Sequence, residues 1–213
     1  MPERKQMMEE KIAKVPKVGV TTLAKLVTGE EVCHLRFWYE KRHPEEAPPP
    51  GPELARWQME HNLVVTKIIQ SLQGGDVERE MWLSLDKPPI IGKTDVTHRL
   101  PGEIHIYEAK SGRQANSHPL QLLTYIFMAR RGAMEGVDGT QLIGHLVYPN
   151  NEVVMGEQDI HPNLEQMMEP HIRAILGSEA PRPVKNPACR WCWADCQFAG
   201  KRSQVKGDGG AVR

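Results

Sequence analysis

Residues 92–127, GKTDVTHRLPGEIHIYEAKSGRQANSHPLQLLTYIF, combine a clear strand pattern with a distinctive set of polar side chains. Asp95 lies in a segment that we expect to be a strand, and Glu108 and Lys110 lie at the end of a second, apolar segment. Residues two apart on a strand point to the same face, so Glu108 and Lys110 share a face. If the strand of Asp95 runs alongside, two carboxylates and one ammonium group meet in one pocket.

Such a pocket has the ligands that a divalent cation needs. Two hard oxygen ligands beside open coordination positions suit Mg²⁺ or Mn²⁺. The ion would polarise a phosphodiester, and Lys110 would orient the attacking water or stabilise charge on phosphorus. Taken singly, each residue has a simpler interpretation, because acid-x-lysine sequences are common at solvated strand ends and a lone aspartate is often a turn or cap residue. The order favours the pocket, since a predicted helix with Gln121 and Tyr125 one turn apart follows.

This ordered set resembles the PD-(D/E)XK nuclease superfamily, and its RecB-like branch in particular. In that branch GxxD, ExK and QxxxY are successive motifs of one active site. Here they are residues 92–95 (GKTD), 108–110 (EAK) and 121–125 (QLLTY). The resemblance implies a restriction-endonuclease-like fold, which is a mixed α/β core, and a metal-dependent nuclease activity.

The resemblance also implies a role for each motif residue. Asp95 and Glu108 would bind the metal ion, with the backbone carbonyl of Ala109 as a further ligand. Lys110 would assist the attacking water. Two helical residues would contact the DNA strand or steady the site: Gln121 and Tyr125.

A histidine completes the proposed metal site. His61 lies within a predicted helix over residues 53–73, whose apolar stripe includes Trp57 and Val64. A helical histidine is most often a surface or core residue. RecB-like nucleases, however, place a histidine on the helix before the catalytic sheet, which implies that His61 joins the metal sphere. Imidazole suits Mn²⁺ better than Mg²⁺.

The four cysteines form the second strong pattern. Cys189, Cys192 and Cys196 lie within eight residues near the end of the sequence, and Cys33 is the one other cysteine. A lone cysteine before aromatic residues is usually a small buried side chain, and a Cys-x-x-Cys pair is a redox pair or half a zinc site. Four thiolates together would hold either zinc or an iron–sulfur cluster, provided that Cys33 returns in space to the other three.

One distant cysteine and three later ones around a nuclease core resemble the iron–sulfur group of RecB-like nucleases. The group includes AddB-type subunits and the CRISPR-associated exonuclease family Cas four, and its opening C-x-x-x-F-x-Y pattern is matched at Cys33, Phe37 and Tyr39. The resemblance implies a 4Fe-4S cluster that ties the two ends of the fold together. The sequence departs from the group in the short spacing between Cys192 and Cys196, and zinc is the alternative metal.

Composition narrows the class of protein. The 213 residues suffice for one core of ordinary size, and the formal net charge is +0, so no overall field gathers nucleic acid. Local groups would have to hold DNA, unless they are merely solvated surface: Arg36, Lys41 and Arg42, or Arg182, Lys185 and Arg190. No apolar run reaches membrane-span length and the first residues lack a signal-peptide pattern, so we expect a cytoplasmic protein without membrane association.

The predicted elements alternate between helices and strands. Helices are expected over residues 21–29, 30–42, 53–73 and 119–131, and over 161–176 with a kink or break at Pro170. Strands are expected over residues 78–86, 90–97, 103–109, 141–149 and 152–155. We therefore predict an α/β fold with a mixed sheet flanked by helices, divided into an arm (1–19), a nuclease domain (20–199) and a flexible tail (200–213).

The function expected from these patterns is a metal-dependent DNA exonuclease that acts on single-stranded ends. No GxxxxGK[ST] phosphate loop is present, so no helicase motor is expected within this sequence. The resemblance to Cas four implies the integration proteins of CRISPR spacer acquisition as partners. The alternatives are a stand-alone phage or repair nuclease, a non-catalytic DNA-end-binding module, and a zinc-stabilised interaction protein with an incidental acidic pair.

Overall fold

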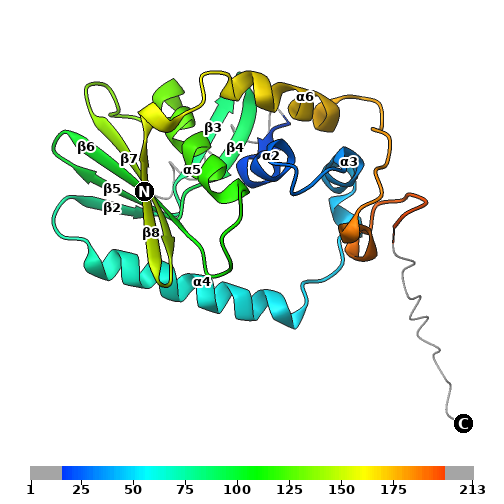
Figure 1. The fold of residues 1–213 in the computed structure, drawn as a ribbon, viewed down its shortest axis with the longest axis horizontal. Coiled ribbons are helices and arrows are strands. Elements are labelled where there is room, and N and C mark those ends of the chain that lie inside the picture. Colours follow the sequence, from blue (N-terminus) through cyan, green and yellow to red (C-terminus); the bar gives the residue numbers. More distant parts are fainter. Residues whose placement is uncertain (1–15, 200–213) are drawn as a thin grey trace, which may run out of the picture.

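The computed structural model describes residues 16–199 and contains two β-sheets (Figure 1). The strands are β1 Val18–Gly19, β2 Asp76–Arg79, β3 Trp82–Asp86, β4 Pro89–Lys93, β5 Val96–Leu100, β6 Glu103–Ala109, β7 Gln141–Tyr148 and β8 Asn151–Gly156. The smaller sheet has the order β1-β4-β3 and the larger the order β2-β5-β6-β7-β8. The pairs β1–β4 and β6–β7 are parallel and the other neighbours are antiparallel, so both sheets are mixed, as the sequence predicted.

Five helices of the described part of the chain, residues 16–199, surround these sheets. They are α2 Val20–Val27, α3 His34–Arg42, α4 Pro52–Ser71, α5 Ser117–Met128 and α6 Leu164–Leu176, with shorter turns η1 Pro44–Glu46, η2 Ala129–Ala133, η3 Glu157–Asp159 and η4 Pro187–Trp191. Figure 1 shows α5 between the five-stranded sheet and α2, which it contacts. The predicted tail lies outside the described residues, as does most of the predicted arm, so the division into arm, domain and tail stays a prediction.

The main core forms where α5 packs on the sheets. Leu122 and Ile126 of α5 and Ile104 and Ile106 of β6 are fully buried, and burying each such side chain is worth about 1.5–3 kcal/mol. The helix lies close to β7 because Gly144 has no side chain: a Cβ there would lie 2.8 Å from Ile126 and 2.9 Å from Leu122.

A smaller core lies on the other side of β6. It consists of residues from the C-terminal half of α4, packed against Val96 and Ala109. Figure 1 shows this half beneath the larger sheet, whereas the N-terminal half of α4 extends past the sheet. Trp57, which the apolar stripe predicted to be buried, is 50% exposed on that extension, so this part of the prediction is wrong.

Two predicted strands are divided in the structure. The segment 78–86 forms β2 and β3, and the segment 90–97 forms β4 and β5, with one member of each pair in each sheet. The chain passes between the sheets at Glu80, which has φ 55°, and at Asp95. The two segments where the chain passes between the sheets are hydrogen-bonded to each other, because Glu80 N donates to Asp95 O (3.1 Å) and Thr94 N donates to Met81 O (2.9 Å). We call these two segments the crossing. Asp95 therefore lies in a bend, and its predicted place within a strand is wrong.

Two helices also differ from their predicted form. The helix predicted to begin at residue 30 begins at His34. The structure keeps α6 as one helix through Pro170, although a break or kink was predicted there. Buried Met168 and Ile172 on either side hold that helix against the core. None of the described helices combines the length and apolar character that a bilayer crossing requires.

Candidate active site

Asp95 is fixed at the junction of the two sheets by its own carboxylate. Oδ2 accepts a hydrogen bond from the backbone N–H of Ala109 at 2.7 Å, which joins the bend to the end of β6. The bend is also supported by Thr94, whose hydroxyl lies 3.1 Å from that of Thr97. Although Asp95 is not in a strand, the structure thus brings it beside the strand that carries Glu108.

Glu108 is a buried carboxylate with one unpaired oxygen. It lies on the α5-facing side of β6 and is only 4% exposed. Oε1 accepts hydrogen bonds from Lys110 Nζ and Gln121 Nε2, both at 2.7 Å, while Oε2 is buried without a hydrogen-bond partner. Burial, and then the charge of Asp95, raise the pKa of Glu108 to about 7, although Lys110 and His61 act in the opposite direction.

The first helical turns of α5 close the site from the other side. Gln121 is bound at both ends of its amide, because its Oε1 accepts from Lys110 Nζ at 2.9 Å and its Nε2 donates to Glu108 and to Tyr125 Oη, the latter at 3.1 Å. Burial and the nearby Glu108 raise the pKa of Tyr125, so its hydroxyl stays protonated. These contacts link the helix to Glu108 and Lys110.

Gly92 explains why the end of β4, just before Asp95, can approach α5. A Cβ atom at this position would lie 2.5 Å from Tyr125 Cε1 and 2.8 Å from a methyl group of Val20. Only a residue without a side chain lets the Tyr125 ring pack there. The glycine of residues 92–95 and the tyrosine of residues 121–125 are therefore in direct contact.

His61 reaches the site from α4. Its Nε2 lies 3.2 Å from Asp95 Oδ1, and this hydrogen bond raises the pKa of His61. Its Nδ1 is buried without a hydrogen-bond partner. The structure therefore brings together every residue that the sequence proposed for the first site: His61, Asp95, Glu108, Ala109, Lys110, Gln121 and Tyr125.

The donor set fits a divalent cation. An unpaired buried oxygen on Glu108, beside the Asp95 carboxylate, is a costly arrangement that a positive ion would relieve. The nearest ligand atoms of His61, Asp95 and Glu108 do not all lie within 4.8 Å of one another. Ala109 and His61 bind the Asp95 carboxylate, while Lys110 and Gln121 bind only Oε1 of Glu108, which leaves Oε2 of Glu108 for an ion. Within residues 16–199 the one more compact set of ligand atoms is that of His43, Glu45 and Glu46 at the surface.

Helix α5 begins at a contact that the sequence did not reveal. Glu30, which precedes α3, accepts hydrogen bonds from the backbone N–H of Ser117 at 2.8 Å and from its hydroxyl at 2.7 Å. These two bonds lower the pKa of Glu30 against the opposing effect of burial. A carboxylate at a helix N-terminus satisfies a free N–H group, so Glu30 fixes the start of the helix that carries Gln121.

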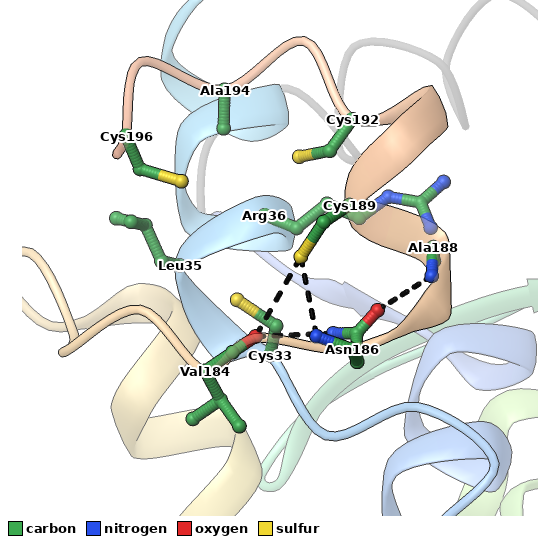
Figure 2. A pocket seen from close by; sticks show the side chains of 10 residues that line it. All are labelled: Cys33, Leu35, Arg36, Val184, Asn186, Ala188, Cys189, Cys192, Ala194 and Cys196. Atoms are coloured by element: carbon green, nitrogen blue, oxygen red, sulfur yellow. Dashed lines mark hydrogen bonds between the residues drawn. The ribbon is translucent and has the colours of Figure 1, made fainter. Parts of the chain in front are cut away.

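The four cysteines line one pocket away from this site. Figure 2 shows Cys33 at the start of α3 and three cysteines of the C-terminal segment with their sulfur atoms turned toward a common space. The other lining residues are Leu35, Arg36, Val184, Asn186, Ala188 and Ala194. Cys189 Sγ also accepts a hydrogen bond from Asn186 N at 3.3 Å. Cys33 thus returns in space to the later cysteines, which four-thiolate ligation requires.

The described arrangement places four thiols around one pocket, which suits either zinc or an iron–sulfur cluster, since both bind four thiolates. Burial raises the pKa of Cys192, and the Arg36 guanidinium opposes that effect.

The first basic group proposed from sequence for DNA is engaged in structural contacts. Arg36 pairs with Glu31 and Glu40. Arg42 donates to Gly177 O at the end of α6 and lies over the Trp38 ring. These side chains hold α3 in place, so the cluster is not a free basic surface.

Comparison with known proteins identifies the family and the fold. A family model described as the PD-(D/E)XK nuclease superfamily matches residues 8–197. No curated protein matches the sequence. Among solved structures, that of SSO0001 is similar in fold, with a TM-score of 0.53 at 18% sequence identity, over 88% of this chain and 90% of that chain.

Proposed function

This chain belongs to the PD-(D/E)XK nuclease superfamily, and from that premise we propose that it is a metal-dependent DNA exonuclease of the RecB-like iron–sulfur branch. We propose single-stranded ends as its substrate. The observation that carries the proposal is the buried, unpaired Oε2 of Glu108 beside Asp95, with Lys110 in contact. A protein that only binds DNA ends has no need of this arrangement.

The residues present fit a divalent ion held by Asp95, Glu108 and the Ala109 carbonyl, with His61 as a further ligand. When bound, Mn²⁺ or Mg²⁺ supplies a polarised phosphodiester and a water of lowered pKa. Lys110 has its ammonium fixed between Glu108 and Gln121, so it holds a positive charge at the site of charge development on phosphorus.

We further propose that the cysteine pocket holds a 4Fe-4S cluster. The convergence of four thiols on one pocket supports a four-thiolate site, and the resemblance to iron–sulfur RecB-like nucleases favours the cluster over zinc. The cluster would act as a structural tether. Anaerobic purification distinguishes the two metals, because a cluster gives a brown protein with broad visible absorption and zinc gives a colourless one.

The cellular setting that we propose is CRISPR spacer acquisition in the cytoplasm, with the integration proteins as partners. The resemblance to Cas four supports this setting. Co-purification of those integration proteins with the tagged full chain tests it. Co-purification of replication or repair proteins alone would instead support a stand-alone phage or repair nuclease.

The central experiment incubates labelled single-stranded DNA with the full chain and Mn²⁺. We expect linear strands to be degraded and closed single-stranded circles to remain intact, because an exonuclease needs an end. Asp95→Asn and Lys110→Ala should each abolish degradation without changing the circular dichroism spectrum, while Glu179→Gln, at an exposed position, should retain wild-type activity. Degradation that survives both substitutions would end the proposed mechanism.

A further inference from the structure

The N-terminal half of α4 presents an apolar surface that no other part of residues 16–199 covers. Its C-terminal half buries Val64, Val65 and Ile68, whereas Trp57 and Leu54 are 50% and 43% exposed. Trp57 precedes His61 by four residues, so both lie on one side of the helix. The stripe that packs on the sheet thus continues through His61 to an uncovered tryptophan.

Trp57 is connected to the acidic pair through His61. The two rings are stacked, with centroids 5.2 Å apart and planes 15° apart, and His61 Nε2 lies 3.2 Å from Asp95 Oδ1. Within residues 16–199, His61 is the one aromatic ring in contact with Trp57. One face of the indole therefore rests on the histidine, and the exposed half of the side chain leaves surface for another flat group.

We infer that Trp57 is a substrate-positioning residue that stacks on a base of single-stranded DNA. This inference rests on the proposed function and specifies how its substrate is selected. Aromatic stacking accepts any base, which suits a nuclease without sequence preference. Since stacked nucleotides rise about 3.4 Å each, the indole lies within about three nucleotide steps of Asp95.

The same geometry selects unpaired over paired DNA. Each internal base of a duplex already stacks on both neighbours, and a tryptophan must separate them before it can stack. An unpaired base offers its face at little cost. Trp57 therefore favours single strands and frayed ends without any hydrogen bond to a base edge.

The surroundings of Trp57 argue for a nucleic acid over an apolar protein surface. Trp57 adjoins His61, whose Nε2 contacts the Asp95 carboxylate, and the side chains of His61 and Asp95 are 18% and 16% exposed. An apolar partner that covered Trp57 and His61 together would also remove water from this polar pair, which is costly. A nucleotide instead places its base on the indole and its phosphate toward Lys110.

The test measures binding in EDTA, so that no cleavage occurs. The full chain, Trp57→Ala, Trp57→Phe and Met59→Ala are titrated against a labelled 20-nucleotide oligothymidylate and a blunt 20-base-pair duplex. Met59 is the matched control, because it is 70% exposed on the same helix and lies two residues, or about 200°, around it. A series of oligothymidylates with one abasic position each is titrated in parallel.

We expect Trp57→Ala to bind the single strand about 5- to 150-fold more weakly, with duplex binding changed less than twofold. Trp57→Phe should recover most of the affinity, and Met59→Ala should match the wild type. One abasic position should weaken the wild type and leave Trp57→Ala unaffected, which a merely structural role does not predict.

Equal loss for single strand and duplex, or equal abasic sensitivity in both proteins, would overturn the inference. So would unchanged DNA affinity together with loss of a dimer in light scattering, since Trp57 would then contact a second copy. The nuclease proposal fails separately, if Asp95→Asn still degrades DNA while the Trp57 effect on binding persists.

Discussion

Glu108 is a deeply buried carboxyl group, and burial disfavours its negatively charged form, so its pKa is raised to about 7. Because this folded-state pKa lies above the unfolded value near 4.5, the stabilising contribution of the protonated form is present below pH 4.5 and is lost as the pH rises through 7. Without metal, the melting temperature of the wild type should therefore fall between pH 5 and 8 relative to that of Glu108→Gln. Differential scanning fluorimetry in EDTA measures both.

Mn²⁺ should reverse this trend, because it binds the deprotonated carboxylate. The increase in melting temperature on adding Mn²⁺ should be larger at pH 8 than at pH 5.5 in the wild type, and absent in Glu108→Gln. Equal pH slopes for the two proteins in EDTA would show that the charge of Glu108 does not destabilise the fold.

Gly92 is sensitive to a single methyl group. Gly92→Ala should lower the free energy of unfolding by about 1–3 kcal/mol, since the new Cβ meets Tyr125 at 2.5 Å. It should also reduce cleavage, because Tyr125 is hydrogen-bonded to Gln121. Urea denaturation of Gly92→Ala and of Gly51→Ala, where a Cβ meets nothing within 4 Å, provides the measurement and its control.

The sequence was sufficient to name most residues that the structure brings together at the site. The spacing of Glu108 and Lys110 on one strand was predictive because side chains on a strand alternate in direction, and the structure has these two in contact at 2.7 Å. Trp57 was misassigned because helical periodicity gives the direction of a stripe but not where the partner surface ends. The contact of Glu30 with Ser117 joins residues far apart in sequence, so no local sequence pattern could predict it.

At the scale of elements, α5 depends on Glu30 for its N-terminal cap. Glu30→Ala should cost about 0.5–2 kcal/mol of unfolding free energy, because Ser117 loses both acceptors. Cleavage should fall as well, since Gln121 lies one turn further along that helix. Urea denaturation compared with Glu45→Ala, an exposed acid in η1, measures the effect; equal stability of the two variants would rule out the cap.

The elements themselves were predicted better than their membership in sheets. Alternation located β6, β7 and β8 correctly, since each is one uninterrupted strand. It could not divide 78–86 or 90–97, because both halves of each segment have strand character and only the sheet to which they pair differs. Tertiary pairing, which is invisible to a local pattern, decided these cases.

At the scale of the whole molecule, the cysteine pocket joins the start of α3 to the C-terminal segment. If a cluster forms there, Cys33→Ser should remove as much visible absorbance and thermal stability as Cys192→Ser, although the two lie at opposite ends of the domain. Absorbance spectra and melting curves of anaerobically purified variants test this. Loss of absorbance in Cys192→Ser alone would show that Cys33 is not a ligand.

The passage of the chain between the two sheets gives the bound ion a mechanical consequence. Asp95 belongs to the crossing and Glu108 to the central strand of the larger sheet, so an ion bound by both would cross-link the crossing to that sheet. Removal of the ion by a chelator should then increase local opening at the crossing before the rest of the fold becomes less stable. Faster deuterium uptake at the amides of Glu80 and Thr94, with the centre of α5 unchanged, is the expected trace.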